Sequence, residues 1–197
     1  YDPQSSELAR RVEEIRRSRA GRARRIVELL SADYPLTWEH VQEQTGEENA
    51  SVGRPHIADA LIAAGIVASR EEAFGRILYA GSPYYVPQES MDPLEATRLV
   101  RAAGGVPVVA HPMSENRGPA LPLDYLGQMA DAGLAGVEVY HRENSEPNRA
   151  RLLEFARDRE LLVTGSSDYH GAGKPNRLGE NTTARETVEA IRAQIRG

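Results

Sequence analysis

The chain has 197 residues, 40% of them hydrophobic and 27% charged, which is typical of a globular protein with one large or two small domains. Its formal net charge of −5 excludes a general attraction to nucleic acid or to anionic membranes, so a phosphate-binding surface would have to be local. The absence of cysteine excludes disulfides and thiolate metal ligands, which leaves histidine and carboxylate side chains as donors for any metal ion.

The first part of the chain has a helical pattern throughout. Across residues 6–30, apolar residues recur with the 3.6-residue period of one helix face, which predicts a long amphipathic helix. Shorter helices are predicted by their capping and stop signals, and these cover residues 37–46, 54–65 and 69–78. Segment 79–90 contains Pro, Gly and Ser and is predicted to be a loop. We therefore expect a helical domain over residues 1–90.

From residue 91 onward, helical and strand-like segments alternate. Short apolar runs predict strands over residues 106–110, 136–140 and 161–165. Amphipathic segments around them predict helices over residues 92–105, 122–133, 147–160 and 182–195. Such alternation favours an α/β fold in which helices cover a parallel sheet, and we expect it to form a second domain, residues 91–197.

Histidine follows the end of each predicted strand. His111 comes after the first strand, His141 after the second, and Asp168 and His170 lie in the segment GSSDYHG after the third. Because the carboxyl ends of parallel strands meet at one edge of a sheet, we expect these side chains to lie close together. Neutral imidazole and carboxylate bind Zn, Mn or Fe, which activate water and stabilise phosphate charge, so His111, Asp168 and His170 are candidate metal ligands. The alternatives are an ordinary turn at GSSDYHG and a structural role for His141.

Two pairs of residues are candidates for binding phosphate. Arg19 and Arg22 fall on the apolar stripe of the first predicted helix, where an unpaired guanidinium is costly to bury. Exposure at a domain edge would explain them, and so would contact with an anion, because the planar guanidinium can form two hydrogen bonds with one phosphate. The alternative is a helix break at Gly21 that separates two faces. Arg54 and His56 lie at the start of a predicted helix, where backbone N–H groups favour anions.

Three segments resemble those of the PHP (polymerase and histidinol phosphatase) family of metal-dependent phosphoesterases, and they occur in the same order: GRPHIA at 53–58, VVAHP at 108–112 and SSDYHG at 166–171. The resemblance covers essentially the whole chain and is closest to the branch of nucleoside 3′,5′-bisphosphate phosphatases and 5′→3′ exoribonucleases. It implies a distorted (βα)7 barrel with an all-helical insertion, and two or three Mn, Fe or Zn ions. It also implies hydrolysis by metal-activated water of small nucleotides, including 3′,5′-bisphosphonucleosides, and of the 5′ ends of short RNA.

The same resemblance implies roles for individual residues. The residues after the first and third predicted strands, His111, Asp168 and His170, match metal ligands of the family. The residues implied to contact the substrate, of which the first two belong to the segment GRPHIA, are Arg54, His56, Arg19 and Arg22. His141, which follows the second predicted strand, is a further candidate for substrate contact.

Other ligand motifs of the family do not occur in this chain, namely H-x-H, T-D-H, a bridging Glu and a His before the insertion. We therefore expect the chain to correspond to the C-terminal two-thirds of a family member and to be incomplete for activity by itself. One alternative is a non-catalytic nucleotide- or RNA-binding remnant. Another is a histidinol-phosphate phosphatase, which the helical segment with GRPHIA disfavours.

The sequence offers no signal for a membrane or for secretion. No apolar run approaches the roughly 20 residues of a membrane span, and the first residues lack the apolar stretch of a secretory signal. We therefore expect a cytoplasmic protein with no membrane partner, and no protein partner is indicated.

Overall fold

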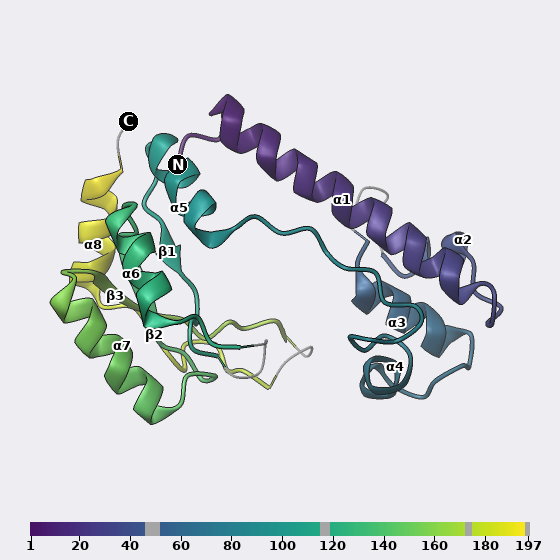
Figure 1. Cartoon of the computed structure of the whole chain (residues 1–197). Helices are drawn as coiled ribbons and strands as arrows, with labels where there is room; N and C mark the ends of the chain where they lie inside the picture. The colour runs from purple at the N-terminus through teal and green to yellow at the C-terminus, as the bar shows by residue number, and fades with distance from the viewer. Residues whose placement is uncertain (46–51, 115–118, 172–174, 196–197) are drawn as a thin grey trace. The chain divides into compact units, whose positions relative to one another are not determined.

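The computed structural model describes residues 1–45, 52–114, 119–171 and 175–195 of the chain (Figure 1). The chain packs into two compact units. One unit is Ala9–Met91, and the other combines Tyr1–Leu8 with Asp92–Gly197. The domains expected at 1–90 and 91–197 stay a prediction, because compactness alone does not show that a unit folds or acts by itself.

In the described ranges, the helical unit contains the long helix and the short helices that the sequence predicts. They are α1 (Ser6–Leu30), whose first residues are assigned to the other unit, α2 (Trp38–Gln42), α3 (Arg54–Ala63) and α4 (Arg70–Arg76). Because α1 continues through residue 21, the alternative of a helix break at Gly21 is wrong. The helix predicted over 37–46 is shorter than expected, and residue 46 lies outside the described residues.

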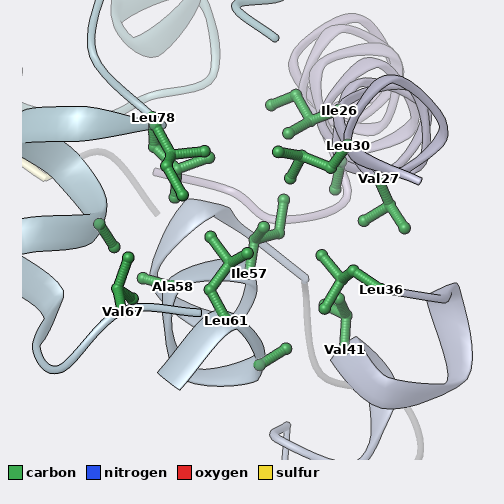
Figure 2. Packing of buried hydrophobic residues seen from close by; sticks show 14 residues of the cluster. Ile26, Val27, Leu30, Leu36, Val41, Ile57, Ala58, Leu61, Val67 and Leu78 are labelled. Carbon is green, nitrogen blue, oxygen red and sulfur yellow. The ribbon is translucent and has the colours of Figure 1, made fainter. Parts of the chain in front are cut away.

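The core of this unit forms between the apolar stripe of α1 and the helices that follow it (Figure 2). Ile26 and Leu30 of α1 are directed toward Ile57 of α3, and all three side chains are almost completely buried. Fully burying such a side chain stabilises a fold by about 1.5–3 kcal/mol. The apolar face that predicts α1 is therefore also the face that packs against the other helices of the unit. The same cluster includes Val27, Leu36, Val41, Ala58, Leu61, Val67 and Leu78.

The length of α1 raises the question of a membrane span. Its 25 residues exceed the roughly 20 that cross a bilayer, but arginine and glutamate occur along its whole length. Among the described residues, none of the helices combines the length and the apolar character that crossing a membrane requires.

The second unit is an α/β structure built on a parallel sheet. The strand order is β1 (Val108–Val109), β2 (Gly136–Tyr140) and β3 (Leu162–Gly165), with β2 in the centre (Figure 1). The helices are α5 (Pro93–Ala102), α6 (Leu123–Asp131), α7 (Glu146–Asp158) and α8 (Arg185–Gln194). The predicted α/β class and the parallel pairing are confirmed, whereas this sheet does not by itself make the distorted barrel that the resemblance implies.

The edge strand β1 is short, and the central strand β2 is buried. β1 is shorter than the predicted strand because Pro107 has no N–H to donate to the ladder, and its carbonyl instead accepts from the N–H of Ala135. In β2, Val137 and Val139 are fully buried, as expected for a central strand covered by helices. His141, which directly follows β2, therefore lies in the buried interior of the unit.

Candidate functional site

The carboxyl ends of the three strands bring four predicted residues into contact. The rings of His111 and His141 have centroids 4.8 Å apart. Nε2 of His141 lies 3.8 Å from Oδ2 of Asp168, and Nδ1 of His170 lies 3.5 Å from Oδ1 of the same carboxylate. We call this continuous set the strand-end row; its members in order are His111, His141, Asp168 and His170. Parallel strands thus deliver these side chains to one edge of the sheet, and the functional roles of the residues stay predictions.

The strand-end row has the donor chemistry that suits a borderline metal ion, because it offers imidazole nitrogens and a carboxylate. In His170, Nδ1 donates to the backbone carbonyl of Asp168 at 2.7 Å, which leaves the lone pair on Nε2. A hydrogen bond of this kind commonly orients a metal-binding histidine. Among the described residues, however, no three His, Asp or Glu side chains are grouped so that they could hold an ion together. The row fits a metal in kind, and complete coordination would need further ligands.

Two residues of the row have backbone conformations that are rare outside glycine. The φ angle is +30° at His111 and +47° at Asp168, and such strain is found where surrounding contacts hold it, often at functional sites. At His111 the contact comes from buried Glu138 of β2, whose Oε2 accepts from the His111 N–H at 2.8 Å. Glu138 is not among the predicted site residues; the signal that could have found it is a charge inside the apolar strand GVEVY.

His141 is the fully buried member of the row. Burial lowers the pKa of its imidazole, and the nearby carboxylate of Glu138 opposes this only in part, so the ring is neutral at pH 7. Its Nδ1 accepts from the N–H of Glu143 at 3.2 Å. Nε2 is buried and has no hydrogen-bond partner within the described residues.

Gly165, at the end of β3, allows the main chain to pass close to Thr182 and Tyr140. The segment that contains Asp168 and His170 follows directly. A Cβ at this position would lie 2.7 Å from the carbonyl oxygen of Thr182 and 2.8 Å from Cβ of Tyr140. The Gly165 N–H donates to the hydroxyl of Thr183 at 3.1 Å, and that hydroxyl donates to the Gly165 carbonyl at 2.9 Å. The segment is therefore fixed at its start by contacts that leave no room for a side chain.

In the helical unit, the predicted phosphate-binding arginines share one neighbourhood, which we call the arginine cluster: Arg19, Arg22 and Arg54. Burial lowers the pKa of Arg22, and the positive charges of Arg54 and Arg19 lower it further. Nε of Arg22 donates to the carbonyl of Val86 at 2.6 Å, and Nη1 of Arg54 donates to the carbonyl of Leu78 at 3.2 Å. In the described part of the chain, the acceptors of Arg22 and Arg54 are carbonyl and amide oxygens. Like charges without a carboxylate acceptor are suited to an anion.

His56 has a local structural role at the start of α3. Its Nδ1 accepts from the N–H of Gly53 at 3.1 Å, which satisfies one backbone donor at the beginning of the helix. A neutral His56 ring then has its proton on Nε2. The residue acts as a helix cap that keeps one donor nitrogen, and its contact with phosphate stays a prediction.

No family model matches the chain. A solved relative is the crystal structure of a Bifidobacterium adolescentis protein that is assigned as a metal-dependent phosphoesterase. It is 43% identical and has a TM-score of 0.92, and the match covers 100% of this chain and 70% of that chain. The chain belongs to the PHP family of metal-dependent phosphoesterases. The family prediction made from the three sequence segments is confirmed.

Curated relatives of this PHP-family chain carry different enzyme names. It is 37% identical over 81 residues to phosphoribosyl 1,2-cyclic phosphate 1,2-diphosphodiesterase of Eggerthella lenta, covering 41% of this chain and 29% of that protein. It is 27% identical over 183 residues to the 3′,5′-nucleoside bisphosphate phosphatase of Chromobacterium violaceum, covering 89% of this chain and 62% of that protein. The PHP-family chain thus spans less than two thirds of the length of either relative.

Proposed function

We propose that the protein is a metal-dependent phosphoesterase that hydrolyses phosphate esters of nucleotides with metal-activated water. The observation that carries this proposal is the strand-end row, in which side chains that follow three strands form a chain of contacts, with His141 lying between the candidate ligands His111 and Asp168. The substrates are 3′,5′-bisphosphonucleosides, in line with the name of the Chromobacterium relative, and the 5′ ends of short RNA, which the branch resemblance implies.

Three residues of the row, His111, Asp168 and His170, would hold divalent Mn, Fe or Zn ions. When bound, such ions neutralise charge on the phosphoryl group and activate water. The chain's own residues orient the ligands: the Asp168 carbonyl holds the His170 ring, and Glu138 holds the backbone of His111. The proposal requires ligands beyond these three, since the described residues do not complete a coordination group. Two or three ions would then occupy the complete site.

The arginine cluster would bind a phosphate of the substrate. Each guanidinium has five N–H donors, so the main-chain contacts of Arg22 and Arg54 leave donors for an anion. A bound phosphate would also offset the repulsion between the like charges of Arg22, Arg54 and Arg19. His56 would add the N–H on its Nε2.

The proposal also assigns residues 91–197 to the C-terminal part of a distorted (βα)7 barrel and the helical residues 1–90 to an insertion in that barrel. Its support is the parallel sheet of β1, β2 and β3 together with the family membership. In parallel barrels, functional residues occupy the carboxyl ends of the strands, which is where the strand-end row lies.

An assay of phosphate release tests the function. The full-length protein is freed of metal with a chelator, and Mn²⁺, Fe²⁺ or Zn²⁺ is added with a 3′,5′-bisphosphonucleoside. We expect inorganic phosphate to be released only when an ion is present. Nucleotide binding without release under every condition would favour the non-catalytic remnant instead. Faster hydrolysis of histidinol phosphate would favour the histidinol-phosphate phosphatase.

We expect Arg54→Ala to weaken substrate binding more than chemistry. The loss of one charge-assisted hydrogen bond of about 1.5–3 kcal/mol raises KM for the bisphosphonucleoside about 10- to 100-fold, while kcat changes less than about threefold. Steady-state kinetics with saturating Mn²⁺ measure both constants.

Arg76→Ala is the matched control for this prediction. Arg76 belongs to α4 of the same unit, and its exposed side chain pairs with Glu72, so its removal should leave KM unchanged. A KM that stays at the wild-type value in Arg54→Ala would contradict the phosphate contact. Equal increases in both variants would point to a general electrostatic effect.

A further inference from the structure

We infer that His141 is a positioning residue for the Asp168 carboxylate, and neither a metal ligand nor a group that contacts the substrate. The part of Asp168 as a ligand is taken from the proposed function, and to that extent the inference rests on it. The tautomer, the burial and the immobility of the His141 ring carry the inference.

Hydrogen bonding determines which nitrogen of His141 carries the proton. The N–H of Glu143 lies 3.2 Å from Nδ1, and a backbone N–H can only donate, so the lone pair of Nδ1 must face it. The neutral ring then has its proton on Nε2. A protonated nitrogen cannot coordinate a cation, which separates His141 from His170, whose Nδ1 donates and whose Nε2 keeps its lone pair.

The buried N–H of His141 needs an acceptor, and the Asp168 carboxylate lies next to it. An unpaired buried donor costs about 1–3 kcal/mol, and Nε2 has no hydrogen-bond partner in the described part of the chain. Its distance to Oδ2 of Asp168 is 3.8 Å, about 0.6 Å beyond the usual limit of an N–H···O hydrogen bond. A rotation of the carboxylate that brought Oδ2 within this limit would pair the buried N–H; the other oxygen, Oδ1, lies 3.5 Å from Nδ1 of His170.

The imidazole is more deeply buried than the carboxylate, so a hydrogen bond between them would orient Asp168 rather than His141. The ring is held by the Glu143 N–H at Nδ1 and contacts His111 on one side, and Nη2 of Arg149 donates to the main-chain carbonyl of His141 at 2.9 Å. His141 has no exposed surface, whereas Asp168 lies at the edge of the unit with its side chain 22% exposed. Direct contact of His141 with a substrate is disfavoured by the same burial.

Two amide variants distinguish the roles of the two ring nitrogens of His141. The amide of Gln reaches the position of Nε2 and can donate there, whereas the shorter Asn can accept from the Glu143 N–H and leaves the Nε2 position empty. We expect His141→Gln to keep the affinity for Zn²⁺, measured by calorimetry, within about threefold. We expect His141→Asn to lower it about 10- to 100-fold, the range for removing a group that orients a ligand.

The outcomes of this comparison are distinct. A large and equal loss of Zn²⁺ affinity in both variants would overturn the inference in favour of direct coordination. Wild-type affinity in both, with only a lower Tm, would overturn it in favour of a packing role. Far-UV circular dichroism establishes that each variant is folded.

Nuclear magnetic resonance of the wild-type protein gives a readout that needs no variant to fold and no activity. Two-bond ¹H–¹⁵N spectra report which ring nitrogen is protonated, and we expect a proton on Nε2 of His141 both without and with Zn²⁺. Protonated Nδ1, or loss of the Nε2 proton when Zn²⁺ binds, would refute the inference. If the protein binds no Zn²⁺, the proposed function fails, and the tautomer of the ion-free protein still decides for or against the Nε2 donor.

Discussion

Asp168→Asn should abolish ion-dependent phosphate release, with a loss of more than about 100-fold. The reason is that even groups that only orient a ligand contribute 10- to 100-fold, and the amide removes the negative charge of the ligand itself. Asparagine has nearly the same shape as aspartate and tolerates positive φ, so the backbone at φ +47° is preserved. Phosphate release and Mn²⁺ affinity, measured on the same preparation, test the prediction.

Two further variants sharpen this test. His170→Ala should show the same loss, because it removes the imidazole whose Nδ1 is held by the Asp168 carbonyl. Asp131→Asn is the control, since Asp131 is exposed and forms a surface ion pair with Arg159 at 2.8 Å, which contributes little. Unchanged turnover in Asp168→Asn or His170→Ala would exclude the ligand role of that residue.

Gly165→Ala should destabilise the α/β unit by about 3 kcal/mol, at the upper end of the cost of overpacking. The added Cβ would lie 2.7 Å from the carbonyl oxygen of Thr182 and 2.8 Å from Cβ of Tyr140, and neither atom can move as the end of a flexible side chain does. Because the next residues lead to Asp168, we also expect weaker metal binding. Urea denaturation followed by circular dichroism measures the free energy of unfolding.

Gly127→Ala is the matched control in the same unit. At Gly127 in α6, the nearest atoms to a new Cβ belong to the guanidinium of Arg159, at 3.1 Å, and this flexible group can move away. Alanine is also favoured over glycine in a helix by about 1 kcal/mol, so we expect no loss of stability. If Gly165→Ala is as stable as Gly127→Ala, the close approach at the end of β3 is not a constraint on the fold.

Much of the fold could be predicted because local patterns and the final packing agree. The 3.6-residue period of α1 places Ile26 and Leu30 in the core, and the alternation after residue 91 leads to the parallel pairing of β1, β2 and β3. The candidate ligands could be predicted for a topological reason. Each follows a strand, and parallel strands end at the same edge of a sheet.

Other features of the site depend on contacts between residues far apart in the sequence. In the sequence, Glu138 is only a charged residue within a predicted strand. In the structure, its carboxylate accepts from the N–H of His111, 27 positions earlier. The different tautomers of His141 and His170 follow from a backbone N–H facing one ring and a backbone carbonyl facing the other.

The sequence alone determined the α/β class, the helical first part, the family and the residue types that could bind a metal or a phosphate, because these depend on periodicity and on residue chemistry. Only the tertiary structure decided which ring nitrogen of His141 and of His170 carries the proton, which carboxylate supports His111 and why residue 165 is a glycine. These properties depend on directions and on distances of a few ångströms, and a linear pattern contains neither.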